Sequence, residues 1–114
     1  MLKIVKPDFE FDDERGSIIQ LIHNGYKQIN VITSKKGVFR GGHYHKQNKE
    51  AFYIISGALT ITVNGESHRF VSGDFFGIEE NDMHSFEFEE DTILVSMYSN
   101  GVELPNNKKD IYTE

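Results

Sequence analysis

The feature that constrains this fold most is a succession of short apolar runs separated by turns that contain glycine or asparagine. Residues 58–63 place Leu, Ile and Val at alternate positions, and Asn64-Gly65 then returns the chain into residues 66–71. Such alternation is typical of a strand with one buried face, and Asn-Gly is a strong signal for a two-residue hairpin turn. No stretch shows a sustained helical repeat with capping residues at both ends.

About ten short strands are expected, and they fit a single domain that spans residues 1–114. Many short strands in one small domain predict an all-β sandwich or barrel. Residues 9–11 suggest an edge strand, and residues 110–112 are expected to pack back as a final strand. The expected strands between them are residues 17–22, 28–33, 41–45, 50–56, 58–63, 66–71, 75–78, 84–88 and 92–98.

The composition excludes several kinds of site and partner. The chain has no cysteine, which excludes disulfides, zinc ribbons, iron–sulfur clusters and thiol nucleophiles. The formal net charge is −6 and no basic stripe is visible, so we expect no nucleic-acid partner. No apolar run approaches membrane-spanning length, and the first residues lack the apolar segment of a signal peptide. We therefore expect a cytoplasmic protein that does not bind a membrane.

Two histidines one residue apart, His43 and His45, are the most informative side chains of the chain. Alternate side chains of a strand point to the same face, so both imidazoles can converge on one point. Glu50 begins the next apolar run, and His84 follows much later. Three imidazoles and a carboxylate form a suitable donor set for a divalent transition metal.

This spacing resembles the first sequence motif of the cupin superfamily, G-x5-H-x-H-x4-E-x6-G. The five specified positions are all matched, by Gly37, His43, His45, Glu50 and Gly57. Together with a weaker second motif, the resemblance covers most of the domain.

The second cupin motif, G-x5-P-x-G-x2-H-x3-N, is matched less completely. Gly73 and His84 agree with it, whereas Glu79, Asn81 and Phe88 replace its proline, glycine and asparagine. Because asparagine tolerates a left-handed turn conformation, these departures affect the expected loop more than the expected metal ligand.

The resemblance implies a double-stranded β-helix, the jelly-roll barrel of cupins. In metal-binding cupins the four motif residues coordinate one divalent ion, and here these residues would be His43, His45, Glu50 and His84. The ion would be Zn, Mn, Fe or Ni, and the pattern does not select among them. The alternative is that the four side chains line the cavity without binding a metal.

Residues 39–44 resemble the Arg-Gly-x-His-Tyr stretch of dTDP-4-dehydrorhamnose 3,5-epimerases, and sugar-nucleotide 3,4-ketoisomerases share a similar pattern that extends to Lys46. In the epimerase family the histidine removes a proton beside a keto group, and the arginine helps to hold the nucleotide diphosphate. These roles would fall on His43 and Arg40. Tyr44 and Lys46 would then contact the substrate.

Two further stretches resemble enzymes of the same kind. Asp-Glu-Arg-Gly at residues 13–16 is similar to a stretch near their N-terminus, which would place Arg15 near the ligand. This stretch and the tail at residues 105–112 also resemble the C-terminal cupin domain of bifunctional UDP-sugar epimerase/reductases of capsule synthesis. That domain binds zinc and epimerises a carbon beside a keto group.

The two implied roles of His43 conflict, because a histidine that coordinates through its available nitrogen cannot also accept a proton. If His43 binds the metal, another group such as Tyr98, Tyr44 or a metal hydroxide must move the proton. If His43 is the base, the metal site loses one ligand. Tyr98, late in the last strong strand, is also our candidate acid. The alternative is that Tyr98 is a core aromatic residue whose hydroxyl has a hydrogen-bond partner.

These patterns together predict a metal-binding isomerase or epimerase that acts on a keto-sugar nucleotide in polysaccharide or deoxysugar biosynthesis. A metal-dependent dioxygenase is one alternative, since the same donor set holds Fe(II) with open positions. A non-enzymatic module that binds a small molecule is another. We also expect a homodimer in which residues 1–11 cross between subunits and cover an exposed sheet edge.

Overall fold

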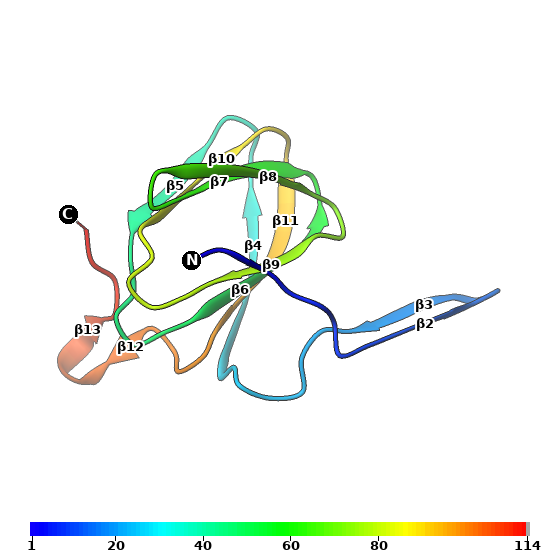
Figure 1. Cartoon of the computed structure of the whole chain (residues 1–114), viewed down its shortest axis with the longest axis horizontal. Helices are drawn as coiled ribbons and strands as arrows, with labels where there is room; N and C mark the ends of the chain where they lie inside the picture. Colours follow the sequence, from blue (N-terminus) through cyan, green and yellow to red (C-terminus); the bar gives the residue numbers. More distant parts are fainter. Residues whose placement is uncertain (114) are drawn as a thin grey trace.

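Two β-sheets face each other across an apolar interior in the computed structural model, which describes residues 1–113 (Figure 1). A short 3-10 helix, η1 (Pro105–Asn107), lies in the tail, and no helix within residues 1–113 has the length and apolar character needed to cross a membrane. The strands are β1 (Lys3–Ile4), β2 (Phe9–Asp13), β3 (Gly16–Gln20), β4 (Gln28–Ser34), β5 (Phe39–His43), β6 (Glu50–Ser56), β7 (Ala58–Val63), β8 (Glu66–Val71), β9 (Phe75–Ile78), β10 (His84–Phe88), β11 (Thr92–Tyr98), β12 (Glu103–Leu104) and β13 (Lys108–Lys109).

The order of the strands is that of a jelly roll. One sheet has five strands in the order β1-β9-β6-β11-β4, and the other has four in the order β5-β10-β7-β8. Neighbouring strands in both sheets are antiparallel. The chain alternates between the two sheets, so residues that are distant in sequence meet in the interior. The prediction of an all-β, jelly-roll fold is confirmed.

Alternate side chains of both sheets fill the interior. Leu59 and Ile61 of β7 are fully buried, as the alternation in the sequence predicts. Phe76 of β9 stacks on Phe52 of β6 at 5.2 Å between ring centroids and on Phe70 of β8 at 4.1 Å. Full burial of one such side chain stabilises a fold by about 1.5–3 kcal/mol, so this aromatic stack joins the two sheets firmly.

Strands β6 to β11 agree residue for residue with the prediction, but the strand of the histidine pair does not. That strand was expected over residues 41–45, whereas β5 ends at His43. The chain leaves the sheet there because the following loop bonds to the C-terminal tail. Tyr44 pairs with Tyr112 in an isolated bridge, so the final strand expected over residues 110–112 is reduced to this one contact.

The second predicted strand, residues 17–22, is also shorter in the structure, where β3 ends at Gln20. Leu21 and Ile22 leave the hairpin and pack on the outer face of the five-stranded sheet, against a small cluster that contains Phe75 and Met97. Burial of these two side chains outweighs continued strand pairing.

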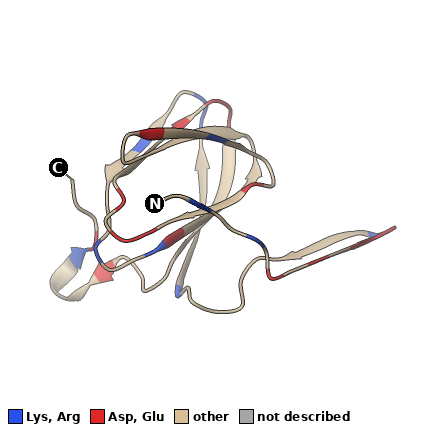
Figure 2. Ribbon diagram, viewed as in Figure 1, with Lys and Arg blue, Asp and Glu red and all other residues tan. Residues whose placement is uncertain are grey.

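Strands β2 and β3 form a hairpin that projects away from the two sheets (Figure 1). It exposes large apolar side chains, with Phe9 52% and Ile18 61% accessible. Acidic residues gather at its outer end (Figure 2). Exposed apolar side chains on an extended arm are typical of interaction surfaces.

Gly57, between β6 and β7, lies where the chain closely approaches β11. Its φ is +104°, and a Cβ there would clash with Oγ1 of Thr92 and lie 2.5 Å from the carbonyl oxygen of Asp91. We expect Gly57→Ala to lower the free energy of unfolding by about 2–5 kcal/mol, through backbone strain and overpacking.

The matched control for this variant is Gly65→Ala, since Gly65 also has a positive φ, +87°, but nothing within 4 Å of a Cβ. Urea denaturation of both variants separates the cost of backbone strain from the cost of overpacking. Equal losses of stability would contradict the importance of the close approach at Gly57.

Candidate functional site

The strand register brings the predicted site residues together in two pairs. In the four-stranded sheet, His43 of β5 lies opposite His84 of β10. In the five-stranded sheet, Glu50 of β6 lies opposite Tyr98 of β11. All four side chains line one cavity between the sheets. His45 lies two residues beyond the end of β5 and joins the same group.

A close approach of two strands places the first pair. Gly41 of β5 has a φ of +94°, and a Cβ on it would lie 2.8 Å from the carbonyl oxygen of His84. The register of β5 and β10 shifts at this point, between His84 and Ser85. Glycine therefore permits the bulge that sets His43 and His84 side by side.

The three histidines form a compact cluster. The ring centroid of His43 lies 5.1 Å from that of His45 and 4.8 Å from that of His84. The ring centroids of His45 and His84 are 5.1 Å apart. One nitrogen from each ring lies within 4.8 Å of the others. His45 and His84 are buried, whereas His43 is partly accessible from the cavity. Such a group can hold one metal ion.

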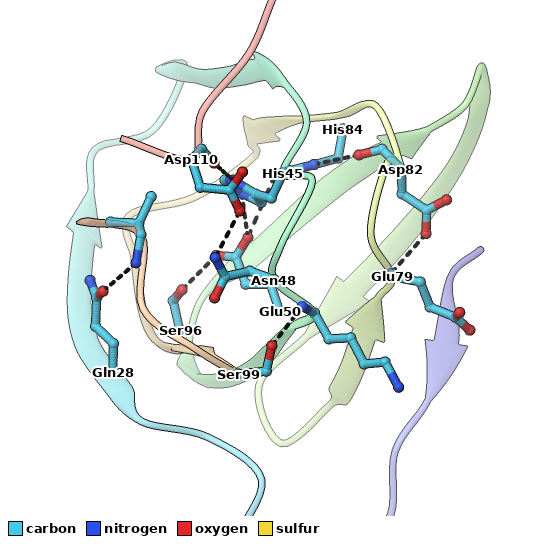
Figure 3. Close-up of polar contacts among 12 residues, drawn as sticks. Gln28, His45, Asn48, Glu50, Glu79, Asp82, His84, Ser96, Ser99 and Asp110 are labelled. Atoms are coloured by element: carbon cyan, nitrogen blue, oxygen red, sulfur yellow. Dashed lines mark hydrogen bonds and ion pairs between the residues drawn. The ribbon is translucent and has the colours of Figure 1, made fainter. Parts of the chain in front are cut away.

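Glu50 adds a buried carboxylate to this cluster (Figure 3). Its Oε1 lies 3.1 Å from Nε2 of His45 and 3.6 Å from Nε2 of His84. Its Oε2 accepts a 2.6 Å hydrogen bond from the hydroxyl of Ser96. The Ser96 hydroxyl thus fixes Oε2 of Glu50, while Oε1 faces the two imidazoles.

Backbone carbonyls fix the orientation of two of these rings. Nδ1 of His45 lies 2.7 Å from the carbonyl oxygen of Asp110, and Nδ1 of His84 lies 2.9 Å from that of Asp82 (Figure 3). Because a carbonyl oxygen can only accept, each Nδ1 carries the proton. In the neutral rings, both Nε2 atoms then present lone pairs toward the Glu50 oxygen.

Three acceptor atoms that converge on one point require a positive charge between them. Burial by itself lowers the pKa of His45, but hydrogen bonds to Glu50 and to the Asp110 carbonyl outweigh it, so this pKa is raised. Burial lowers the pKa of His84, against the attraction of Glu50. A divalent cation between these donors would supply such a charge. The residues present therefore fit the implied ion.

His43 differs from the other two histidines. Within residues 1–113 no hydrogen bond fixes either of its ring nitrogens. Burial lowers the pKa of His43 to about 4, the nearby His84 and His45 add to this shift, and Glu50 partly opposes it. Its imidazole is therefore neutral at physiological pH and is oriented only by packing.

The cavity beside the cluster has a volume of about 390 Å³ and is half open to solvent. Its polar wall is formed by His43, His84, Glu50 and Tyr98, and Arg40 also lines it. A small polar ligand can therefore meet both a cationic and an anionic group while its less polar parts face aromatic rings. The apolar part of the wall consists of Ile32, Phe39, Phe52, Phe86, Phe88 and Leu94.

Arg40 and Tyr98 both contribute to this cavity, as expected from the sequence. The guanidinium of Arg40 donates to Oγ of Ser34 at 2.8 Å and to the carbonyl oxygen of Thr33 at 3.2 Å, which holds it at the end of β4. The ring of Tyr98 meets His45 edge-on at 5.2 Å between centroids. Burial, together with the charge and a hydrogen bond of Glu50, raises the pKa of Tyr98, so its hydroxyl stays protonated.

Three other residues that were expected to contact the substrate lie away from the cavity of their own chain. Arg15 is exposed at the tip of the projecting hairpin, where it pairs with Asp13 at 2.6 Å. The ring of Tyr44 lies 5.6 Å from that of Tyr112, and Nζ of Lys46 lies 4.3 Å above the Tyr112 ring. None of the three lines the cavity.

Sequence reasoning did not identify Ser96, Asn48 or Asp110, which support the cluster from outside. Ser96 could have been found, because it occupies an inward-facing position between Leu94 and Tyr98 in an otherwise apolar strand. Asn48 and Asp110 are almost completely buried although both lie in segments that read as polar loops. No local pattern marks such residues.

Comparison with known proteins places this geometry in a family. A family model described as "Cupin domain" matches residues 30–99. Quercetin 2,3-dioxygenase from Bacillus subtilis (strain 168) is 29% identical over 79 residues, 68% of this chain and 23% of that protein. The HTH-type transcriptional regulator PuuR of Escherichia coli (strain K12) is 26% identical over 76 residues, 63% of this chain and 41% of that protein. The chain spans less than half the length of either relative.

Several solved structures have the same fold. A 3,4-ketoisomerase from Helicobacter canadensis has a TM-score of 0.82 at 23% identity, covering 99% of this chain and 90% of that one. A dTDP-4-dehydrorhamnose 3,5-epimerase from Sulfolobus tokodaii has a TM-score of 0.71 at 20% identity, with coverages of 86% and 70%. The capsular polysaccharide assembling protein CapF from Staphylococcus aureus has a TM-score of 0.65 at 25% identity, with coverages of 92% and 33%.

Proposed function

This chain belongs to the cupin domain family, and on that premise we propose that it is an isomerase or epimerase of a keto-sugar nucleotide. The observation that carries the proposal is the position of His43. It is a neutral imidazole on the wall of a half-open cavity, beside a buried carboxylate and within the same cavity as Arg40. Proton transfer next to a ketone needs an unprotonated base and a nearby positive charge.

The shape and charge of the cavity support a sugar nucleotide as the substrate. A volume of about 390 Å³ accommodates a sugar ring, and the half-open side leaves room for the nucleotide to extend into solvent. Arg40 is the cation placed on this wall, and a guanidinium is well suited to a diphosphate. The apolar wall suits the less polar face of the sugar.

His43 then takes the proton from the carbon next to the keto group, and the electrons of that C–H bond move onto the keto oxygen to form an enolate. Return of the proton to the other face of the same carbon restores the ketone and gives an epimer. For a ketoisomer, the enolate oxygen takes a proton, the hydroxyl on the deprotonated carbon loses its proton and becomes the new keto group, and the former carbonyl carbon takes a proton. Tyr98, which stays protonated beside Glu50, is the residue placed to donate a proton.

We assign the cation-holding role to His45, His84 and Glu50. A bound divalent ion would supply positive charge for the developing enolate oxygen. Since neither ring nitrogen of His43 is fixed within residues 1–113, His43 can turn toward a substrate, whereas His45 and His84 cannot turn without losing their carbonyl partners.

Exchange of solvent deuterium tests the proposal directly. The purified protein is incubated in deuterium oxide with a panel of 4-keto nucleotide sugars, and NMR follows the carbons that flank the ketone. We expect exchange into at least one of them. Absence of exchange across the panel would refute the proposed chemistry, and a ligand that only raised the melting temperature would favour a binding module instead.

A metal-dependent dioxygenase is the second candidate, and the similarity to quercetin 2,3-dioxygenase supports it. The cluster of His43, His45 and His84 beside Glu50 also suits Fe(II). Iron in the untreated protein together with oxygen uptake would favour this function. Zinc, manganese or nickel without oxygen uptake would favour the isomerase.

We also propose a homodimer. Because β1 pairs with β9 of its own chain, the part of the N-terminal segment that remains to reach a second copy is the β2–β3 hairpin. The edge strand β4 exposes Ile29 and Val31, 65% and 68% accessible, which offers an apolar surface for it. Such a dimer would also carry Arg15 toward a second copy.

Multi-angle light scattering tests the dimer. We expect twice the chain mass of 13.1 kDa for the natural chain, and a shift toward the single mass for Ile18→Asp, which places a charge on the exposed hairpin. A monomer mass for the natural chain at micromolar concentration would contradict the proposal.

A further inference from the structure

The C-terminal tail is bound to the loop that carries His45 by one buried carboxylate. Asp110 is completely inaccessible, and its Oδ1 accepts a 2.9 Å hydrogen bond from the amide of Lys46. Its Oδ2 accepts from the amide of Gln47 at 2.8 Å. The same oxygen accepts from Nδ2 of Asn48, also at 2.8 Å (Figure 3). The carboxylate therefore determines how this loop lies against the tail.

Asn48 completes this connection from the side of the loop. It is 1% accessible, and its Nδ2 also donates to the carbonyl oxygen of Gly101 at 2.9 Å. Its Oδ1 accepts from the amides of Asn100 and Gly101, both at 2.9 Å. The side chains of Asn48 and Asp110 thus have their hydrogen-bonding capacity satisfied almost entirely by each other and by the backbone.

The same aspartate also contacts the site, through a different atom. Its backbone carbonyl accepts the Nδ1 proton of His45 at 2.7 Å, which leaves Nε2 facing Glu50. Movement of the tail would release this proton and let the imidazole adopt the other tautomer. Hydrogen bonds of this kind, to the second nitrogen of a metal-binding histidine, set its orientation and basicity.

We propose that Asp110 is a positioning residue for His45. Its carboxylate fixes the tail on the loop, and its carbonyl thereby holds His45 in the tautomer whose Nε2 faces the cation-holding group. The C-terminal tail is accordingly part of the site and not only a cover for the barrel. Only the effect of Asp110 on the rate of solvent-deuterium exchange rests on the proposed function. The tautomer of His45 and the affinity for the ion are measured without a sugar.

Asp110→Asn is the test variant. Asparagine has one acceptor oxygen in place of two, so its amide must face a donor at Lys46 or at Gln47 and Asn48. We expect Zn²⁺ affinity, measured by competition with a chromophoric chelator, to fall by about 10–100-fold. Long-range ¹H–¹⁵N spectra of the metal-free protein at alkaline pH report the tautomer of His45. In the natural chain the proton should lie on Nδ1. In the variant the ring should exchange between the Nδ1-protonated and the Nε2-protonated tautomers.

Gln28→Ala is the matched control, because Oε1 of Gln28 accepts from the amide of Val102 at 2.8 Å and so anchors the tail away from the ring. We expect this variant to lower the melting temperature while His45 keeps its tautomer and Zn²⁺ affinity stays unchanged.

A natural chain with its His45 proton on Nε2 would overturn the inference, even if Asp110→Asn failed to fold. Equal losses of Zn²⁺ affinity in the two variants would also overturn it, since general loosening of the tail would then explain both. Loss of affinity in Asp110→Asn alone, in a protein without exchange activity, would support the inference and contradict the proposed function.

Discussion

Replacing His43 with asparagine is expected to lower the rate of solvent-deuterium exchange into a 4-keto nucleotide sugar by about a hundredfold to ten-thousandfold, the usual contribution of a general base. Zn²⁺ affinity should stay close to that of the natural chain. The physical reason is that His45, His84 and Glu50 already converge on one point, whereas the His43 ring is turned to the cavity and lacks a fixed partner within residues 1–113.

The control for His43→Asn is His68→Asn on β8, which lies outside the cavity and should change neither quantity. The exchange rate is measured by NMR and the affinity by chelator competition, on the same preparations. Loss of Zn²⁺ together with loss of exchange would make His43 a metal ligand, and another residue such as Tyr98 would have to be the base.

Glu50→Gln is expected to weaken Zn²⁺ binding by at least about a hundredfold, because removing one partner of a buried charge pair costs about 3–5 kcal/mol. Deuterium exchange should be lost with the ion. The metal-free variant, however, should melt at the same temperature as the natural metal-free chain or above it. Glutamine can donate from its amide to Nε2 of a neutral His45 and still accept from Ser96, so the side chain keeps both hydrogen bonds of Glu50 without its charge.

Calorimetry of the metal-free proteins and chelator competition together check this prediction. Glu87→Gln is the control, since Glu87 lies on β10 but faces solvent. A strongly destabilised metal-free Glu50→Gln would show that Glu50 serves the fold more than the ion. Unchanged Zn²⁺ affinity would remove Glu50 from the site.

The strand prediction succeeded where burial alternates along the chain and erred where tertiary contacts end a strand. Strands β7, β10 and β11 bury nearly every second residue, so their pattern is local. The strand with the histidine pair ends early because the loop after His43 bonds to Asp110 near the end of the chain. A contact over such a separation leaves no trace in the neighbouring residues.

The same distinction applies to the individual site residues. His43, His45, Glu50 and His84 were expected from their spacing, and the structure brings them into one group. Arg15 was also expected near the ligand, but the hairpin holds it away from the cavity of its own chain. Arg15 can lie near a ligand only if the hairpin reaches a second copy of the chain. A sequence does not say which chain a projecting arm contacts.

The sequence by itself determined the alternation that makes this chain all-β, the motifs whose resemblance implies a jelly roll, and the residue types that can hold a cation or take a proton. Only the tertiary structure decided what each imidazole can do. The partner of His45 is the carbonyl of Asp110, 65 residues away, and that of His84 is the carbonyl of Asp82, while His43 has none within residues 1–113. The proton on an imidazole goes to the nitrogen that meets an acceptor, so the roles of three chemically identical side chains depend on which backbone the fold places beside them.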